Sequence, residues 1–125
     1  MLKNEKGFTL IEIIAVLVIL GILAAVAIPR YFSLMDQSRI SAAQGAIGEI
    51  KARASGAYAK LLLTGNGADP GEPSVLASVS TDVGSDFSGL TVTASGSNLV
   101  ITVPTVKGNT MSSTPTSTWY YPTQS

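Results

Sequence analysis

The chain has 125 residues, no cysteine, no histidine and a formal net charge of zero, with 46% hydrophobic and only 13% charged residues. The missing side chains exclude thiol nucleophiles, serine–histidine–aspartate triads, histidine general bases and zinc sites built from cysteine or histidine. Zero net charge disfavours a nucleic-acid partner, which requires a basic surface. An enzyme would have to rely on carboxylates, lysine or serine. We therefore expect no enzymatic activity, no metal, no cofactor and no nucleic-acid partner.

The apolar residues gather near the N-terminus. Residues 8–28 read FTLIEIIAVLVILGILAAVAI and carry a single charge, Glu12. A helix of this length spans about 31 Å, which matches the hydrocarbon core of a bilayer. Lys3 and Lys6 precede it and, by the positive-inside rule, keep the N-terminus cytoplasmic. The pattern predicts one membrane helix whose C-terminal side is translocated.

Two simpler interpretations compete for this segment. A cleavable secretory signal has an apolar region of about 7–15 residues followed by small residues, and Ile28-Pro29-Arg30-Tyr31 fits such a cleavage site poorly. A plain membrane anchor explains everything except Glu12, because a charge deep in a membrane helix costs about 2.5–3.5 kcal/mol. A glutamate that merely reaches the membrane interface is the remaining alternative for Glu12.

The run Gly7-Phe8-Thr9-Leu10-Ile11-Glu12, with a basic leader before it and an apolar helix after it, resembles the processing motif of bacterial type IV prepilins. Gly21 and Pro29 are placed as in that family, and the resemblance covers residues 1–55. The segments 29–34 and 57–60 are most similar to the mannose-sensitive haemagglutinin type. The resemblance implies an α+β ladle, in which a long N-terminal helix packs on a small antiparallel sheet of about four strands.

The resemblance also implies the maturation and assembly of the chain. A prepilin peptidase would cut between Gly7 and Phe8 and N-methylate Phe8. Gly7 suits a narrow cleft because it has no side chain. The new Phe8 amine and the Glu12 carboxylate would be the only charges of the mature membrane segment, and each would be held ionised most easily by the other. Pairing between neighbouring subunits would set the axial register of assembly.

Gly21 and Pro29 mark a weak stretch of the helix. Proline removes a backbone donor, and glycine weakens a helix interior by up to about 1 kcal/mol. The free subunit is expected to keep a continuous helix with a kink near Pro29. In the assembled fibre, the resemblance implies partial melting between these two residues.

The next segment reads as an amphipathic helix. Apolar residues recur three and four positions apart, at Ile40, Ala43, Ile47, Ile50, Ala54, Ala57 and Leu61. The helix should end near Thr64, because Gly65-Asn66-Gly67 follows. We expect this apolar face to pack against a sheet formed by the rest of the chain.

The sheet is predicted from alternating sequence. Residues 90–93 and 99–103 read as strands joined by a turn at 95–98, and residues 75–79 read as a strand or a helical turn. Trp119-Tyr120-Tyr121 is predicted as a closing strand between Pro115 and Pro122. Without a disulfide, the packing of these three aromatic side chains must hold the C-terminal segment.

Two groups of residues in the head suggest further sites, one for a calcium ion and one for glycosylation. Asp82 and Asp86, with Asp69 and Glu72, offer the oxygen ligands that calcium prefers, but they form no compact ligand run, and a solvated acidic loop is the preferred interpretation. The Ser/Thr-rich stretch 110–118 has a composition that permits O-glycosylation.

These expectations define four regions: a leader (1–7), a transmembrane and polymerisation helix (8–29), an amphipathic helix (30–63), and a loop with a β head (64–125). The predicted function is a structural subunit of a type IV pilus, used in adhesion and motility. Its partners would be copies of itself, the prepilin peptidase, the inner-membrane assembly machinery and the membrane. The head would be periplasmic before assembly and extracellular afterwards. The alternatives are a pseudopilin of a type II secretion system and a membrane-anchored binding domain that never assembles.

Overall fold

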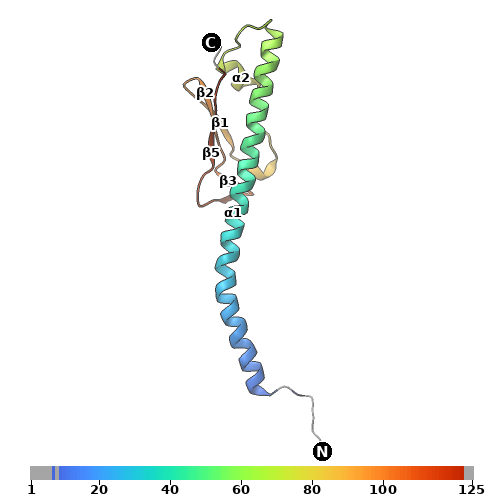
Figure 1. Cartoon of the computed structure of the whole chain (residues 1–125), viewed down its shortest axis with the longest axis vertical. Helices are drawn as coiled ribbons and strands as arrows, with labels where there is room; N and C mark the ends of the chain where they lie inside the picture. The colour runs from blue at the N-terminus through green and yellow to red at the C-terminus, as the bar shows by residue number, and fades with distance from the viewer. Residues whose placement is uncertain (1–6, 8, 123–125) are drawn as a thin grey trace, which may run out of the picture. The chain divides into compact units, whose positions relative to one another are not determined.

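The computed structural model describes Gly7 and residues 9–122. The longest element is helix α1, Leu10–Thr64, which contains Pro29 in its interior. The chain divides into two compact units, Met1–Met35 and Asp36–Ser125, and α1 contributes residues to both. Figure 1 shows the strands and α2 beside the C-terminal half of α1, within the second unit.

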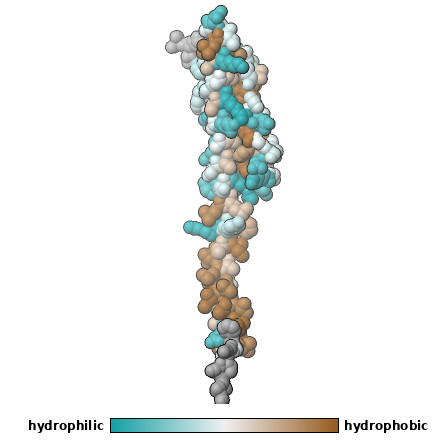
Figure 2. Space-filling view, turned by 90° about the vertical axis from the view of Figure 1, so that its right-hand side faces the viewer, coloured by the Kyte–Doolittle hydropathy of each residue, from teal (hydrophilic) through white to brown (hydrophobic). Residues whose placement is uncertain are grey.

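The first unit contains the apolar part of α1. Every residue from 9 to 34 is exposed, and large side chains such as Leu10 and Val26 are 78% and 70% exposed. Figure 2 shows hydrophobic side chains covering this part of the helix. Among the described residues, α1 is the one helix that is long and apolar enough to cross a membrane.

The second unit pairs its strands antiparallel in two sheets. Strands β1 (Thr91–Ser95), β2 (Asn98–Thr102) and β5 (Thr116–Trp119) form a sheet in the order β1-β2-β5. Strands β3 (Thr105–Val106) and β4 (Asn109–Thr110) form a separate hairpin. The turn between β1 and β2 has Gly96 at its first central position with φ of 66°, as type II′ turns prefer. Helix α2 (Glu72–Ser78) and the 3-10 turn η1 (Ser85–Phe87) precede the sheet.

The core of this unit lies between α1 and one face of the sheet. Ile50 and Ala54 of α1, Val75 of α2, and Leu99 and Ile101 of β2 are fully buried in one cluster. The predicted apolar face of residues 40–61 therefore packs on the sheet, which confirms the α+β fold. Helix α1 ends at Thr64, as the glycines after it predict.

The structure decides several local predictions. Of the two alternatives for residues 75–79, the helical one is confirmed, because α2 reaches Ser78 and has a proline in its first turn, which favours a helix start. The closing strand is β5, so it ends at Trp119 instead of beginning there. The described residues form five strands, close to the expected number; the strands that the sequence did not indicate are β3 and β4, which Lys107 and Gly108, both with positive φ, join in a short hairpin.

The core predicts a clear difference between two identical substitutions. Leu99→Ala removes a fully buried side chain and should lower the free energy of unfolding by about 2–5 kcal/mol. Leu63→Ala removes a side chain that is 82% exposed and should change it by less than about 0.5 kcal/mol. Urea unfolding of the full chain in detergent, followed by tryptophan fluorescence, measures both. Equal losses would contradict this placement of the core.

Candidate processing and assembly site

Helix α1 begins with a reciprocal capping interaction. The backbone N–H of Thr9 donates to Oε2 of Glu12 at 2.9 Å, and the backbone N–H of Glu12 donates to Oγ1 of Thr9 at 3.3 Å. This is the capping box of a Thr-x-x-Glu sequence, and it satisfies two backbone donors that would otherwise lack partners. Glu12 therefore has a structural role at the start of the helix in this form of the chain.

Sequence reasoning missed this capping box, although its signal was present in the Thr9-Leu10-Ile11-Glu12 spacing. The isolated charge of Glu12 in an apolar run predicts pairing with an amine, but it does not by itself indicate a helix cap. The structure adds a second, local reason for a glutamate three residues after a threonine. A capping box also accepts glutamine, so it does not itself require the charge.

The predicted cleavage bond joins Gly7 to Phe8. Gly7 is exposed and lies before the helix, and a Cβ added there would meet nothing within 4 Å. Among the described residues, no steric contact would therefore prevent a larger side chain at position 7. Phe8 lies outside the described residues, so its pairing with Glu12 stays a prediction.

The surface beside Glu12 is apolar and open. A shallow groove on the helix is lined by Glu12, Ile13, Val16 and Leu17. The last three side chains are all large hydrophobics without cover within the unit, with exposures of 44%, 54% and 61%. A carboxylate at the edge of an apolar groove suits a partner that brings one positive charge and apolar side chains together.

Gly21 and Pro29 both lie within the unbroken span of α1. A Cβ added at Gly21 would meet nothing within 4 Å, so no packing within the chain requires glycine there. The melting of this stretch on assembly stays a prediction.

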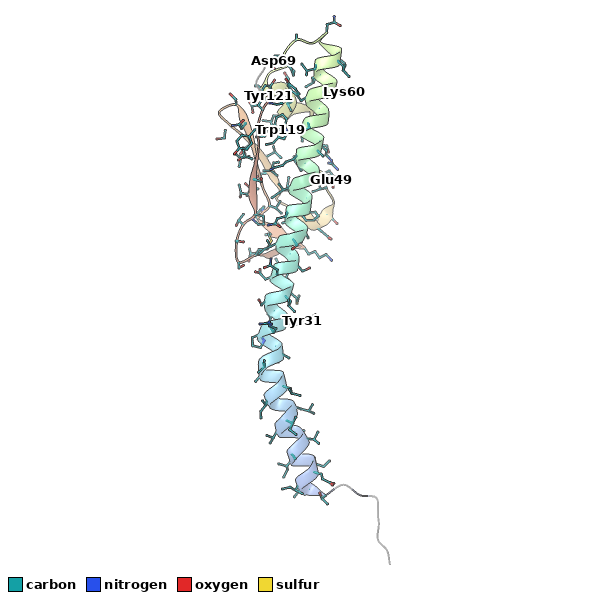
Figure 3. The ribbon with its side chains drawn as sticks, viewed as in Figure 1. Tyr31, Glu49, Lys60, Asp69, Trp119 and Tyr121 are labelled. Atoms are coloured by element: carbon teal, nitrogen blue, oxygen red, sulfur yellow. The ribbon has the colours of Figure 1, made fainter. Side chains whose placement is uncertain are left out.

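An aromatic cluster holds the C-terminal segment against α1. Tyr58, Trp119 and Tyr121 meet edge to face in all three pairs, with ring centroids 5.3–6.5 Å apart. Figure 3 shows Trp119 and Tyr121 near Asp69, which belongs to the loop after α1. The indole N–H of Trp119 donates to Oγ of Ser55 at 2.9 Å, and the Tyr121 hydroxyl donates to the Asp69 carboxylate.

This cluster, which we call the aromatic clasp (Tyr58, Trp119, Tyr121 and Asp69), confirms the predicted aromatic packing for two of three residues. The exception is Tyr120, whose side chain is 74% exposed. Alternation along the chain places it on the opposite side from Trp119 and Tyr121. No sequence signal identified Asp69 as the partner of Tyr121, because 52 residues separate them.

Two other contacts tie the loops of the head to α1. Asp36 accepts the Ser112 backbone N–H at 3.0 Å and the Ser112 hydroxyl at 2.5 Å. Arg53 donates to the backbone carbonyls of Ser80 and Asp82 at 2.9 and 2.8 Å and pairs with Glu49. In the described part of the chain, no three acidic, histidine or cysteine side chains gather closely enough to hold a metal ion.

These contacts shift the titration of the groups involved. The Ser112 hydroxyl and backbone N–H lower the pKa of Asp36 below its ordinary value of 3.8. The Tyr121 hydroxyl, and then the Gly71 N–H, lower the pKa of Asp69. Burial, and then the hydrogen bond to Asp69, raise the pKa of Tyr121 to about 12.

The clasp predicts a pH-dependent effect of Tyr121→Phe. The lowered pKa of Asp69 stabilises the fold above pH 3.8, and this contribution is lost as the pH falls through the folded-state pKa. The raised pKa of Tyr121 stabilises the fold below pH 10, and this contribution is lost as the pH rises toward about 12. The variant should therefore be less stable than the parent between these limits, with the difference shrinking outside them. Denaturation across pH measures it, with Tyr120→Phe as control; a difference independent of pH would contradict the clasp.

Comparisons with known proteins find a family motif in the N-terminal segment of the chain, and several relatives of the chain. The family described as "Prokaryotic N-terminal methylation motif" matches residues 2–28. The "Fimbrial protein EcpC" of Eikenella corrodens is 37% identical over 103 residues, which are 82% of this chain and 64% of that protein. The "Type IV narrow pilus major component PilA5" of Thermus thermophilus is 57% identical over 35 residues, covering 28% of this chain and 30% of that protein.

A relative from a secretion apparatus is also similar. The "Type II secretion system core protein G" of Pseudomonas aeruginosa is 50% identical over 50 residues, 40% of this chain and 35% of that protein. The chain thus spans 30% to 64% of the length of these three relatives. No solved structure matches the chain. The chain thus carries the N-terminal methylation motif and is similar over most of its length to a fimbrial protein.

Proposed function

We propose that this chain is a structural subunit of a type IV pilus filament and not an enzyme. The observation that carries the proposal is the apolar part of α1. Residues 10–34 are exposed throughout, with no cover from the described residues of their unit, and the methylation motif ends within this segment. In the membrane, lipid would cover this surface. In a filament, the same segments of neighbouring subunits would replace the lipid, and van der Waals packing between the helices would supply the favourable free energy of association.

Maturation would prepare this segment for assembly. Cleavage between Gly7 and Phe8 removes Lys3 and Lys6, and N-methylation of Phe8 follows. The chain would pass from a single-pass precursor in the inner membrane, with a periplasmic head, to an extracellular pilus. The prepilin peptidase and the inner-membrane assembly machinery would be its transient partners.

Glu12 would serve both the free subunit and the filament. Its Oε2 accepts the Thr9 N–H in the capping box. A carboxylate has further lone pairs on both oxygens, so it can accept from an amine while it keeps the cap. The Phe8 amine of a neighbouring subunit would then neutralise Glu12 at the edge of the apolar groove, and this pairing would fix the axial register.

The stretch between Gly21 and Pro29 would let the assembled helix lengthen. Its backbone hydrogen bonds are weakened by both residues, and the exposed segment around it has no packing within the unit that would be lost on melting. We propose that the transmembrane region 8–29 melts locally here, while the helix beyond it remains part of the head.

A pseudopilin of a type II secretion system is the second candidate function. The similarity to the secretion core protein G is its specific support, but that alignment covers 40% of this chain, against 82% for the fimbrial protein EcpC. Deletion of the gene for this chain distinguishes the two functions. Loss of long surface fibres would support a pilin, and blocked release of secreted proteins with intact fibres would support a pseudopilin.

Substitutions at Glu12 separate its charge from its capping role. Glu12→Gln keeps a capping side chain but removes the charge, whereas Glu12→Ala removes both. If pairing drives assembly, both variants should reduce sheared surface filament severely, because an unpaired buried amine costs about 3–5 kcal/mol. Both should leave membrane insertion and processing intact. Thr9→Ala is the matched control, because it weakens the cap by about 0.5–2 kcal/mol and keeps the charge.

The readout is filament yield relative to total subunit in the cell. Normal yield from Glu12→Gln with a loss in both Glu12→Ala and Thr9→Ala would assign Glu12 to capping alone. Normal yield from Glu12→Ala would remove Glu12 from the assembly mechanism altogether.

Processing predicts a defined mature N-terminus. Mass spectrometry of surface filaments should find a chain that begins at Phe8, heavier than the unmodified cleaved chain by one methyl group on the α-amine. Gly7→Val should block this cleavage, because a branched side chain would not fit a cleft that accepts glycine. A surface-exposed chain that still begins at Met1 would contradict the proposed maturation.

A further inference from the structure

The outer face of the three-stranded sheet carries a regular array of hydroxyl groups. The strand register aligns Thr91, Thr102 and Thr116 in one row across the sheet, and Thr93, Val100 and Thr118 in the next. The Thr116 and Thr102 hydroxyls lie 3.4 Å apart, which confirms that they share a face. Neighbouring positions are about 6.8 Å apart along a strand and about 4.8 Å apart across strands.

This face is open. Thr91, Thr93 and Thr116 are exposed, while Leu99 and Ile101 on the opposite face are fully buried in the core. Tyr120 follows Thr116 and Thr118 on the same side of the chain by alternation, just beyond the end of β5, and its side chain is 74% exposed. The sheet therefore presents hydroxyls, methyl groups and one phenol ring, which we call the threonine face (Thr91, Thr93, Val100, Thr102, Thr116, Thr118 and Tyr120).

The threonine face lacks charge where charge is expected. Strands β1 and β5 are the two edges of the sheet, and edge strands are commonly protected by lysine or other charged side chains. Here β1, β2 and β5 contain no Asp, Glu, Lys or Arg. Strand propensity explains threonine, but it does not explain the absence of charge.

The chemistry of this face selects a neutral, polyhydroxylated partner. Each threonine hydroxyl offers one donor and two acceptor lone pairs, which match the mixed donors and acceptors of sugar hydroxyls. The methyl groups and the Tyr120 ring offer apolar surface to the C–H faces of sugar rings. A charged partner would lose hydration and find no counter-charge on these strands.

From these observations we infer that the threonine face binds neutral polysaccharide. Binding at one subunit needs only the folded head. The inference rests on the proposed function in one respect: a filament would repeat a weak site many times and turn it into avid attachment.

The test uses the full-length chain in detergent, so that it does not depend on filament formation. The chain is sedimented with microcrystalline cellulose, a neutral probe, and with alginate gel, an anionic one. Thr93→Val/Thr118→Val keeps shape and strand propensity but removes two hydroxyls. Thr81→Val/Thr110→Val is the matched control, because both threonines are exposed and neither belongs to the threonine face. Circular dichroism checks that each variant is folded.

The parent chain should sediment with cellulose and not with alginate. Thr93→Val/Thr118→Val should weaken binding about tenfold, the loss expected for two net hydrogen bonds. Tyr120→Ala should weaken it too, and the control should bind as the parent does. Equal retention by both probes, or equal binding by all variants, would overturn the inference. Loss of self-association in Thr93→Val/Thr118→Val with unchanged cellulose binding would identify a second copy as the occupant and also overturn it.

Discussion

The structure depends on an apolar helical surface that no other described residue of its unit covers. The first part of α1 exposes nearly every side chain from residue 9 to residue 34, and most of these are apolar. A continuous exposed apolar surface of this size is unfavourable in water, and the proposed function covers it with lipid or with neighbouring copies of the chain. One carboxylate, that of Glu12, lies near the start of this segment, and the second unit folds around its own core.

The head keeps its own fold without a disulfide. Its core joins α1 to one sheet face, and the aromatic clasp fixes the C-terminal segment through Trp119, Tyr121 and Asp69. Asp36 and Arg53 tie two further loops to the helix. Several separate non-covalent contacts thus hold the C-terminal segment and the loops against α1. This division leaves the apolar segment free to change its surroundings while the head stays folded.

Sequence reasoning predicted the parts that follow from periodicity and composition. The apolar span, the buried face of residues 40–61, the end of α1 at Thr64 and the β1–β2 hairpin all come from patterns within a few residues of one another. It failed where the outcome depends on partners distant in sequence. The bond between Tyr121 and Asp69, and the exposure of Tyr120, require the folded sheet. The β3–β4 hairpin was missed because Lys107 adopts a positive φ that lysine rarely takes.

At the candidate site, the motif residues were recognised by resemblance, and the structure added the capping box that links Thr9 to Glu12. That link matters because one carboxylate would have to start the helix and receive a neighbour's amine. The two roles are compatible in their hydrogen bonds, since Oε2 serves the cap and lone pairs remain.

A reconstruction of the native filament by electron cryomicroscopy would show what forms its core. Residues 10–28 of neighbouring subunits should pack together there, with each Glu12 carboxylate within hydrogen-bonding distance of a neighbour's Phe8 amine. A filament held together by its heads alone, with residues 10–28 outside the core or Glu12 facing no amine, would contradict the proposed assembly.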